Sequence, residues 1–275
     1  MLTAAIRDLH TTYPELDIAV TAPSQYLWKN NPHIATIFKA DQLIRLGYET
    51  PRMRGFLGAK HHFIYAFHDA LEKELGVEIL RGDPHPDIYL TEEEKQPVIA
   101  ADKPILLVNA GSKADCPIKQ WPLERFQAVV NAVQDTYTVI QIGDAKNAAN
   151  HVKLDGVVNM LGATPGRRLL SLMYQASAVL TGVSYPMHLC AAINAKDDKK
   201  RKCVVLAGNR EDEYWERYVG HNYLMGKTRE CCQEHGCWRR RLDPETPDLS
   251  CLHIETDSAA CMRDITVDQV VKCLK

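Results

Sequence analysis

The chain has 275 residues, of which 45% are hydrophobic and 25% charged, and its formal net charge at pH 7 is -2. This composition is typical of an ordinary globular protein. It argues against a disordered or fibrous chain, and against a nucleic-acid-binding protein with a strong basic excess. The longest apolar runs, such as residues 104–110, are far shorter than the roughly 20 residues of a membrane span, and no signal-peptide pattern follows Met1. We therefore expect a cytoplasmic protein with at most peripheral contact with the inner face of a membrane.

The first hundred residues alternate short apolar runs with helical patterns. Residues 4–14 predict a helix that ends near Pro14, and residues 17–23 and 35–40 predict strands. Residues 60–76 predict a helix with an apolar stripe formed by Ile64, Phe67, Leu71 and Leu75. The alternation indicates an α/β domain in which helices cover a parallel sheet.

Prolines and charged residues are concentrated between residues 82 and 103, which predicts a domain boundary. We place two Rossmann-like domains at residues 1–98 and 99–275. The second repeats the rhythm of the first, with strands at 104–112, 137–144, 178–182 and 202–209 and helices at 121–133, 166–178 and 265–275. Two open α/β sheets in tandem create a cleft, and ligands gather there at the carboxyl ends of the strands.

Three polar loops follow strands of the second half. The side chains that carry chemistry are Ser112, Lys113 and Lys119 in the first loop, Asp144 and Lys146 in the second, and Thr181, Ser184 and His188 in the third. Lysines, hydroxyls and a helix start suit a diphosphate, because backbone amides and the helix dipole favour negative charge and a lysine neutralises it. An N-cap role for Ser184 and an ordinary backbone hydrogen bond for His188 are the alternative interpretations.

Several segments together resemble a known family. "VNAGS", "KQWPLERF" and "VVNMLGATPGRRLLSLMYQASAVLTGVSYPMHLCAA" resemble the second domain of glycosyltransferase family 9, whose best-known members are the ADP-heptose lipopolysaccharide heptosyltransferases. "AAIRDLHTTYPELDIAVTAP" and the later "NPHI" resemble its first domain. The resemblance implies two Rossmann-like domains of the GT-B type. It places acceptor contacts in the N-terminal domain and a nucleotide-diphosphate sugar donor in the C-terminal one.

The resemblance also implies a set of donor-binding residues. Lys119, in its Lys-x-Trp-Pro setting, matches the family lysine that contacts donor phosphate. The donor-binding residues that we expect are Asn109, Gly111, Ser112, Lys119, Gly143, Asp144, Thr181, Gly182, Ser184, Met187 and His188. Two positions depart from the family pattern Thr-Asn-Asp-Ser-Gly-Pro-Met-His, because Val183 stands in place of the Asp and Tyr185 in place of the Gly.

The expected catalytic base has no match. Family members begin with a strand and a Gly-Asp pair whose Asp deprotonates the acceptor, whereas Met1 already lies at the helix start and Asp8 is about two turns too far along. General-base catalysis contributes roughly 10²- to 10⁴-fold in rate. The chain is therefore truncated, uses another base, or binds a nucleotide sugar without transferring it. The resemblance further implies an inverting reaction without a catalytic metal, and the sequence has no Asp-x-Asp triplet.

Six of the nine cysteines fall between Cys231 and Cys273. Thiolates of Cys232, Cys237, Cys251 and Cys261 could form a structural zinc or iron site, while reduced thiols or disulfides are the alternatives. Some family members carry a Cys-rich C-terminal insertion, which favours a structural role. The neighbouring Arg239, Arg240 and Arg241 suit a phosphorylated acceptor or an anionic membrane, although a solvated basic loop is the preferred interpretation.

Three functions stay open at this point. The first is a glycosyltransferase that moves a sugar from a nucleotide-diphosphate donor to lipopolysaccharide or another surface glycan. Heptose is a candidate sugar, and an ADP-sugar is the preferred donor. The acceptor is a glycan or a lipid-linked glycan. The second is a catalytically silent protein that binds a nucleotide sugar. The third is a sugar-nucleotide epimerase, which would need a pair of cleft carboxylates that we cannot place in the sequence.

Overall fold

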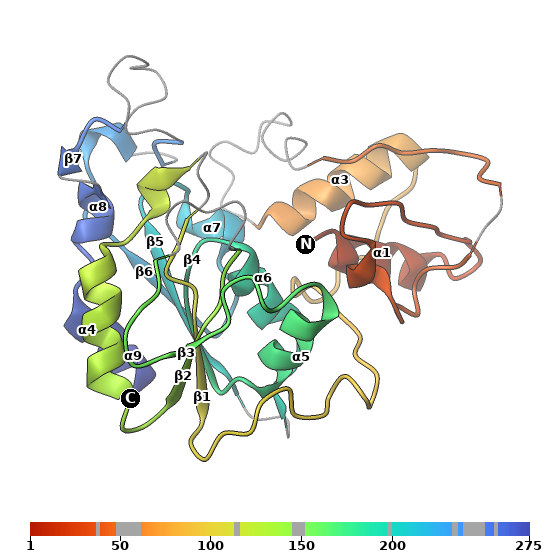
Figure 1. Ribbon diagram of the computed structural model, residues 1–275. Helices are drawn as coiled ribbons and strands as arrows, with labels where there is room; N and C mark the ends of the chain where they lie inside the picture. Colours follow the sequence, from red (N-terminus) through yellow and green to blue (C-terminus); the bar gives the residue numbers. More distant parts are fainter. Residues whose placement is uncertain are drawn as a thin grey trace.

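The computed structural model describes residues 1–36, 39–47, 62–112, 116–144, 152–196, 200–232, 236–238, 251–255 and 258–275. A six-stranded parallel sheet with the order β3-β2-β1-β4-β5-β6 forms the centre of the second half (Figure 1). Its strands are β1 (Ile105–Val108), β2 (Thr138–Gln141), β3 (Val158–Asn159), β4 (Ala178–Gly182), β5 (Lys202–Gly208) and β6 (His221–Met225). The predicted α/β class is confirmed.

The central strands are apolar along their whole length because helices cover both faces of the sheet. All four residues of β1 are buried, and successive side chains alternate between the two faces. Leu107 and Val179 join the apolar core on one face, whereas Leu106 and Leu180 join the core on the other. A strand that is buried on both sides needs no polar alternation, which is why short uninterrupted apolar runs predicted β1 and β4 correctly.

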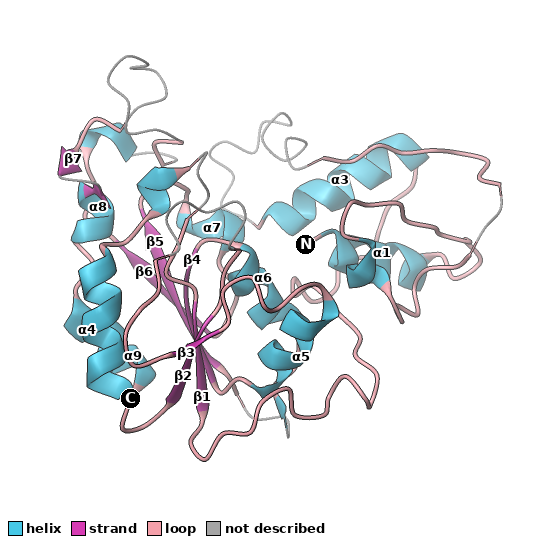
Figure 2. Cartoon of the chain, viewed as in Figure 1, coloured by secondary structure: helices cyan, strands magenta, loops and turns pink. Residues whose placement is uncertain are grey.

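Two groups of helices complete the layers (Figure 2). α4 (Leu123–Val133), α8 (Ala260–Arg263) and α9 (Val267–Leu274) pack on one face, and α5 (Arg167–Gln175) and α6 (Tyr185–Ala192) on the other. The predicted stripe of α4 is buried as expected; it consists of Phe126, Val129, Val130 and Val133. The shorter elements are η1 (Gln25–Trp28), η2 (Pro117–Lys119), α7 (Glu213–Glu216), η4 (Glu230–Cys232), β7 (Ile254–Glu255) and β8 (Ser258–Ala259). Among the described residues, no helix combines the length and the apolar character that crossing a bilayer requires.

The N-terminal half is built from α1 (Leu2–Thr12) and α3 (Phe63–Leu75), and its described residues up to Pro104 contain no strand. The helix predictions are confirmed, and α3 ends where Gly76 adopts a left-handed conformation with φ 69°. The strand prediction for residues 17–23 is wrong. Residues 35–40 likewise show no strand where they are described, and Ile37 and Phe38 lie outside the described residues.

The missing strands have a physical explanation. Ile18 accepts a hydrogen bond from the Ala35 amide at 2.7 Å, but this contact is not continued as a ladder. An apolar run of strand length becomes a strand only when a neighbouring segment pairs with it, which is a tertiary property. The proposed boundary between residues 98 and 99 stays a prediction.

Several polar contacts join the two halves. Arg167 at the start of α5 forms a two-pronged ion pair with Glu94 and also donates to the carbonyl oxygens of Tyr26 and Tyr89. The Arg167 hydrogen bond lowers the pKa of Glu94 to about 2. The hydroxyl groups of Tyr26 and Tyr185 lie 3.1 Å apart.

Asp8 of α1 forms a buried polar cluster with α3. Its Oδ2 atom lies 2.9 Å from Nε2 of His68 and accepts a hydrogen bond of 2.9 Å from the Gly82 amide, while Oδ1 accepts one of 2.9 Å from Nε of Arg7. Nδ1 of His68 bonds the Ile64 carbonyl oxygen at 2.9 Å. Asp8 is 4% exposed and His68 is completely buried. The carboxylate thus fixes the two N-terminal helices to each other.

Replacing this carboxylate tests the structural role. We expect Asp8→Ala to lower the free energy of unfolding by about 3 kcal/mol, because His68 and the Gly82 amide lose their buried partner. Urea denaturation measures the change, and Asp17→Ala serves as the control because Asp17 is exposed. A loss no larger than that of the control would contradict the assignment.

Candidate functional site

The carboxyl ends of four neighbouring strands meet at one edge of the sheet. The loops after β1, β2, β4 and β5 begin at Asn109, Ile142, Val183 and Asn209. Parallel strands point the same way, so these loops lie on one rim, where ligands of open α/β sheets bind. The residues predicted to bind the donor lie in these loops, at the end of β4 and at the start of α6.

Lys119 reaches this rim from η2. Its Nζ atom lies 2.6 Å from Oε1 of Glu211 and donates a hydrogen bond of 3.2 Å to the carbonyl oxygen of Val183. The guanidinium group of Arg210 pairs with the same oxygen of Glu211. Lys119 therefore ties the loop after β4 to the loop after β5.

The charges of this cluster support each other. Burial alone would lower the pKa of Lys119, but the carboxylates of Glu211 and Glu216 outweigh it and raise the pKa. Burial alone would raise the pKa of Glu211, yet Lys119 and Arg210 lower it. Lys119, Arg210 and Glu211 are thus ionised at neutral pH. The Lys-x-Trp-Pro motif predicted Lys119, but no motif predicted Arg210, Glu211 and Glu216. These three residues lie in the charged run "REDEYWE" after the last predicted strand.

The turn from Thr181 to His188 leads from β4 into α6. Ser184 is the N-cap residue of α6, but its side chain makes no capping hydrogen bond. Its hydroxyl instead lies 2.9 Å from that of Thr181 and donates to the Gly182 carbonyl oxygen at 3.3 Å. The two predicted hydroxyls therefore lie together at the rim, whereas Met187 is completely buried in the core under α6. Only the backbone atoms of Met187 can therefore contact a ligand.

The other predicted residues are distributed around the rim. Asn109 is 8% exposed, and its side-chain amide donates to the Ile142 carbonyl oxygen at 3.2 Å, so it holds the ends of β1 and β2 together. Gly143 accepts a hydrogen bond of 2.8 Å from the Gly162 amide. Gly111 and Ser112 are half-buried and Asp144 is exposed. The remaining predicted residues lie outside the described residues; they are Lys113, Lys146, Arg239, Arg240 and Arg241.

His188 belongs to an aromatic cluster around the buried Tyr218. Nδ1 of His188 lies 2.9 Å from the Tyr218 hydroxyl oxygen, and its Nε2 atom lies 3.9 Å from Oε1 of Glu216. Three further imidazole rings surround Tyr218 with ring centroids at 4.7 Å for His62, 5.8 Å for His85 and 5.4 Å for His221. His62 and His85 come from the N-terminal half, so the cluster joins the two halves beside the rim.

Two histidines of this cluster, His62 and His188, are held neutral. Burial first, and the nearby positive charges second, lower the pKa of His188 well below its ordinary value. Burial lowers the pKa of His62 to about 3. A neutral His188 can donate a hydrogen bond to an anion but adds no charge, so Lys119 and Arg210 are the cations of this region. Lys119 and His188 nevertheless face a common carboxylate, Glu216.

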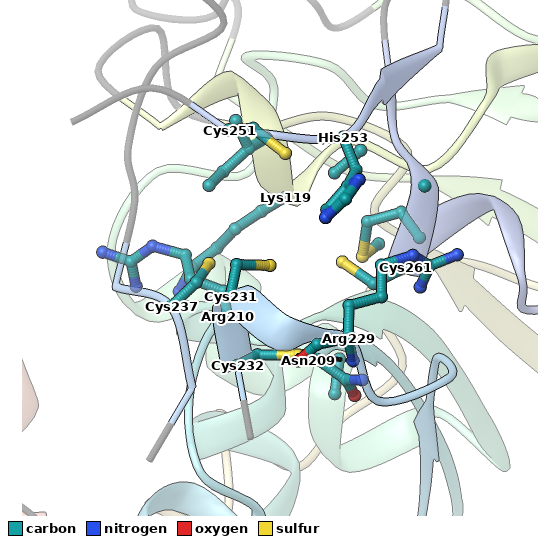
Figure 3. A pocket seen from close by; sticks show the side chains of 15 residues that line it. Lys119, Asn209, Arg210, Arg229, Cys231, Cys232, Cys237, Cys251, His253 and Cys261 are labelled. Carbon is teal, nitrogen blue, oxygen red and sulfur yellow. Dashed lines mark hydrogen bonds between the residues drawn. The ribbon is translucent and has the colours of Figure 1, made fainter. Parts of the chain in front are cut away.

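The four cysteines predicted to bind metal line one pocket next to Lys119 (Figure 3). Cys232 lies in η4, Cys251 precedes β7, Cys261 lies in α8, and Cys237 belongs to the connecting segment. Cys231 is a fifth thiol that the sequence analysis left out. Among the described residues, only Cys190, Cys203 and His221 form a group of three ligand atoms within 4.8 Å of one another. The pocket thiols are therefore gathered around one space but are farther apart than bound ligands would be.

The comparisons with known proteins identify the family of the chain. Residues 57–218 match the family model of glycosyltransferase family 9 (heptosyltransferase), which is more than half of the chain. The chain belongs to glycosyltransferase family 9. The match covers α3 and the sheet as far as β5, with the rim residues Lys119, Glu211 and His188, and it ends before the cysteine-rich segment. The resemblance inferred from the sequence is confirmed.

Two solved glycosyltransferase structures, with TM-scores of 0.52 and 0.50, have the same fold. A family 9 glycosyltransferase from Veillonella parvula is 17% identical with a TM-score of 0.52, and the match covers 78% of this chain and 59% of that one. The dodecameric iron-containing heptosyltransferase TibC of enterotoxigenic E. coli, in complex with ADP-D-β-D-heptose, is 21% identical with a TM-score of 0.50, covering 76% and 51%. The E. coli ADP-heptose lipopolysaccharide heptosyltransferase II is 18% identical with a TM-score of 0.48, covering 77% and 59%. The matches thus span only about half to three fifths of these relatives, and no curated protein matches the chain.

The neutral state of His62 in this family member is testable through pH. The unfolded chain takes up a proton near pH 6.5, whereas the folded chain resists it down to about pH 3, so stability falls as the pH drops through this window. We expect the stability of the wild type to fall by up to about 1.4 kcal/mol per pH unit more than that of His62→Asn, which keeps a capping side chain. Urea midpoints from pH 7 to pH 4 measure the difference, and parallel profiles would contradict it.

Proposed function

We propose that the chain transfers a sugar from a nucleotide-diphosphate donor to a surface glycan, with the donor diphosphate bound at the rim of the sheet. The observation that carries this proposal is the convergence of Lys119 with the Thr181–His188 turn on one rim, in a chain that belongs to glycosyltransferase family 9. ADP-heptose is the preferred donor class because TibC is described with ADP-D-β-D-heptose. Lipopolysaccharide is the preferred acceptor class because one structural relative is a lipopolysaccharide heptosyltransferase.

The chemistry of donor binding follows from the charge cluster. A diphosphate at the start of α6 meets backbone amides of the helix and the positive end of its dipole. Lys119 already touches the Val183 carbonyl oxygen beside this turn, so a small shift of its ammonium group from Glu211 brings it to the phosphate. In the transfer reaction the same cation stabilises the negative charge that develops on the departing diphosphate. We assign the donor to residues 99–275 and the acceptor to residues 1–98.

A second candidate function is nucleotide-sugar binding without transfer. It is favoured by the surroundings of Asp8, the carboxylate nearest in sequence to the family's base: Asp8 is buried and bonded to His68, Gly82 and Arg7. A carboxylate in that position cannot accept a proton from a glycan hydroxyl. Val183, which replaces the family Asp of the donor loop, is also buried in the apolar core. Asp8 is therefore not the base of a transfer reaction.

Donor binding and donor turnover must be measured separately. We expect Lys119→Ala to weaken ADP-heptose binding about 10- to 100-fold, the loss of one charge-assisted hydrogen bond, while Lys95→Ala leaves it unchanged. Lys95 is the control because it is a partly exposed lysine, paired with Glu92, in the segment between α3 and β1. Calorimetric titration gives the affinity. Equal affinities of the two variants would refute the rim site.

Acceptor-dependent release of ADP from ADP-heptose then separates the two functions. Release that requires acceptor and disappears in Lys119→Ala supports the transferase. Tight donor binding without such release supports the silent binding protein. Glu211→Gln frees Lys119 and Arg210 from their shared carboxylate, so this variant should bind pyrophosphate more tightly than the wild type as long as its circular dichroism spectrum is unchanged.

We also infer a structural iron or zinc ion at Cys232, Cys237, Cys251 and Cys261. The donor set fits, because four soft thiols line one pocket and thiolates select zinc or iron. TibC, a structural relative, is described as iron-containing. Binding would draw η4 and the segment before β7 together, since the sulfur atoms are too far apart in this structure to share one ion.

Metal analysis tests this inference. We expect Cys237→Ser and Cys251→Ser each to lose one equivalent of metal per chain, measured by mass spectrometry of the digested protein, whereas Cys273→Ser on α9 keeps it. An iron site absorbs visible light through sulfur-to-iron charge transfer, and a zinc site does not. Disulfides between these cysteines in the freshly purified protein would contradict the inference.

A further inference from the structure

A second group of side chains with metal-ligand atoms lies at the opposite end of the sheet. The ligand atoms of Cys190, Cys203 and His221 all lie within 4.8 Å of one another. Cys203 is completely buried, Cys190 is 8% exposed and His221 is half-buried. Neither the donor-binding rim nor the cysteine-lined pocket includes these residues.

The fold brings the three residues together from separate elements. Cys203 and His221 lie near the amino ends of β5 and β6 and are direct partners in the parallel register. Partners in adjacent strands project from the same face of a sheet. Cys190 comes from α6, which packs on that face (Figure 1). The cluster thus depends on the pairing of the edge strand β6 and could not be found from sequence spacing.

The spacing of the ligand atoms suits one small ion. Zinc bonds sulfur at about 2.3 Å and nitrogen at about 2.0–2.1 Å, so ligand atoms of a tetrahedral site lie about 3.3–3.8 Å apart. The separations at this cluster are at most 4.8 Å, and rotamer adjustments of about 1 Å close the difference. Nδ1 of His221 is buried without a hydrogen-bond partner among the described residues, and the ring packs edge-on against Tyr218.

A buried arginine next to this cluster favours a negatively charged group at Cys190. Arg201 is 9% exposed, and its guanidinium group donates to the carbonyl oxygens of Ala176, Cys190 and Ile193. Its Nη1 atom lies 4.0 Å from Sγ of Cys190, and no carboxylate within the described part of the chain pairs with it. A buried cation without an anionic partner is costly, and a thiolate at Cys190 would provide that partner.

We propose that Cys190, Cys203 and His221 bind a structural zinc ion that fixes the edge strand β6 to β5 and α6. The two thiols lose their protons to solvent on binding, the imidazole stays neutral, and a solvent molecule takes the fourth position. Two thiolates balance the charge of the ion. Two sulfurs and one nitrogen are a donor set that zinc prefers over magnesium or calcium.

The position of the site gives it a role in the architecture. Edge strands are held by a single neighbour, and a metal bridge adds a second attachment for β6. Cys190 lies on the helix that begins at Ser184 and carries His188, so the ion would also fix the orientation of α6 on the sheet. This proposal does not depend on donor binding or on transfer.

Metal content of the full chain tests the proposal. We expect the wild type to contain one more equivalent of zinc than Cys190→Ser and His221→Asn, while Cys273→Ser matches the wild type. His221→Asn is the milder change because His221 is half-buried, and His221→Cys should restore the equivalent because a thiolate replaces the imidazole. A merely structural packing role would not produce this rescue.

A second set of variants distinguishes the proposed site from the cysteine-lined pocket. In a chain with Cys237→Ser and Cys251→Ser, one cobalt ion should still bind and give the visible bands of a tetrahedral sulfur-containing site, and His221→Asn should abolish them. Cobalt bands unchanged by His221→Asn would overturn the proposal, as would equal zinc in the wild type and Cys190→Ser. A Cys190–Cys203 disulfide detected by mass spectrometry of the unreduced protein would overturn it as well.

Discussion

The rim of the sheet depends on one buried carboxylate, Glu211. It holds Lys119 and Arg210 at the same point and is itself kept ionised by them. Without it, two cations would repel each other in a region with little solvent. Lys119 and Arg210 therefore lie near the start of α6. An anionic ligand that binds there can replace the Glu211 carboxylate as the partner of these two cations. The proposed donor site is organised before a ligand arrives, and such pre-organisation lowers the free-energy cost of binding.

The junction between the two halves is built on a different principle. Aromatic and imidazole rings surround Tyr218, and Phe63 of α3 packs against Trp215 of α7 with centroids 4.9 Å apart. Burial lowers the pKa of His62 and His188, so these two rings stay uncharged, although the buried carboxylate of Glu216 lies 3.9 Å from Nε2 of His188. Arg167 and Glu94 add an ion pair between the two halves.

Much of the second half could be predicted from the sequence because its signals are local. Apolar runs of four to seven residues marked β1, β4 and β5, and the 3.6-residue period marked α4 and α9. Their position after strand ends predicted that Lys119 and the Thr181–His188 turn share one rim, and they do; their role in donor binding stays a prediction. The N-terminal strand at 17–23 was wrong because an apolar run does not reveal whether a partner strand exists. β6 was missed because an exposed edge strand has only a weak apolar pattern.

The sequence by itself determined the fold class, the family, the Lys119 motif and the set of cysteines that share a pocket. These features rest on periodicity and on residues that are close together in the chain. Only the tertiary structure decided that Glu211 holds Lys119, that Asp8 is locked against His68, and that Cys190, Cys203 and His221 meet. In each case the partners come from different elements, and their distance is set by strand pairing and helix packing. Such contacts leave no local pattern, since the chain between them can take many lengths and compositions.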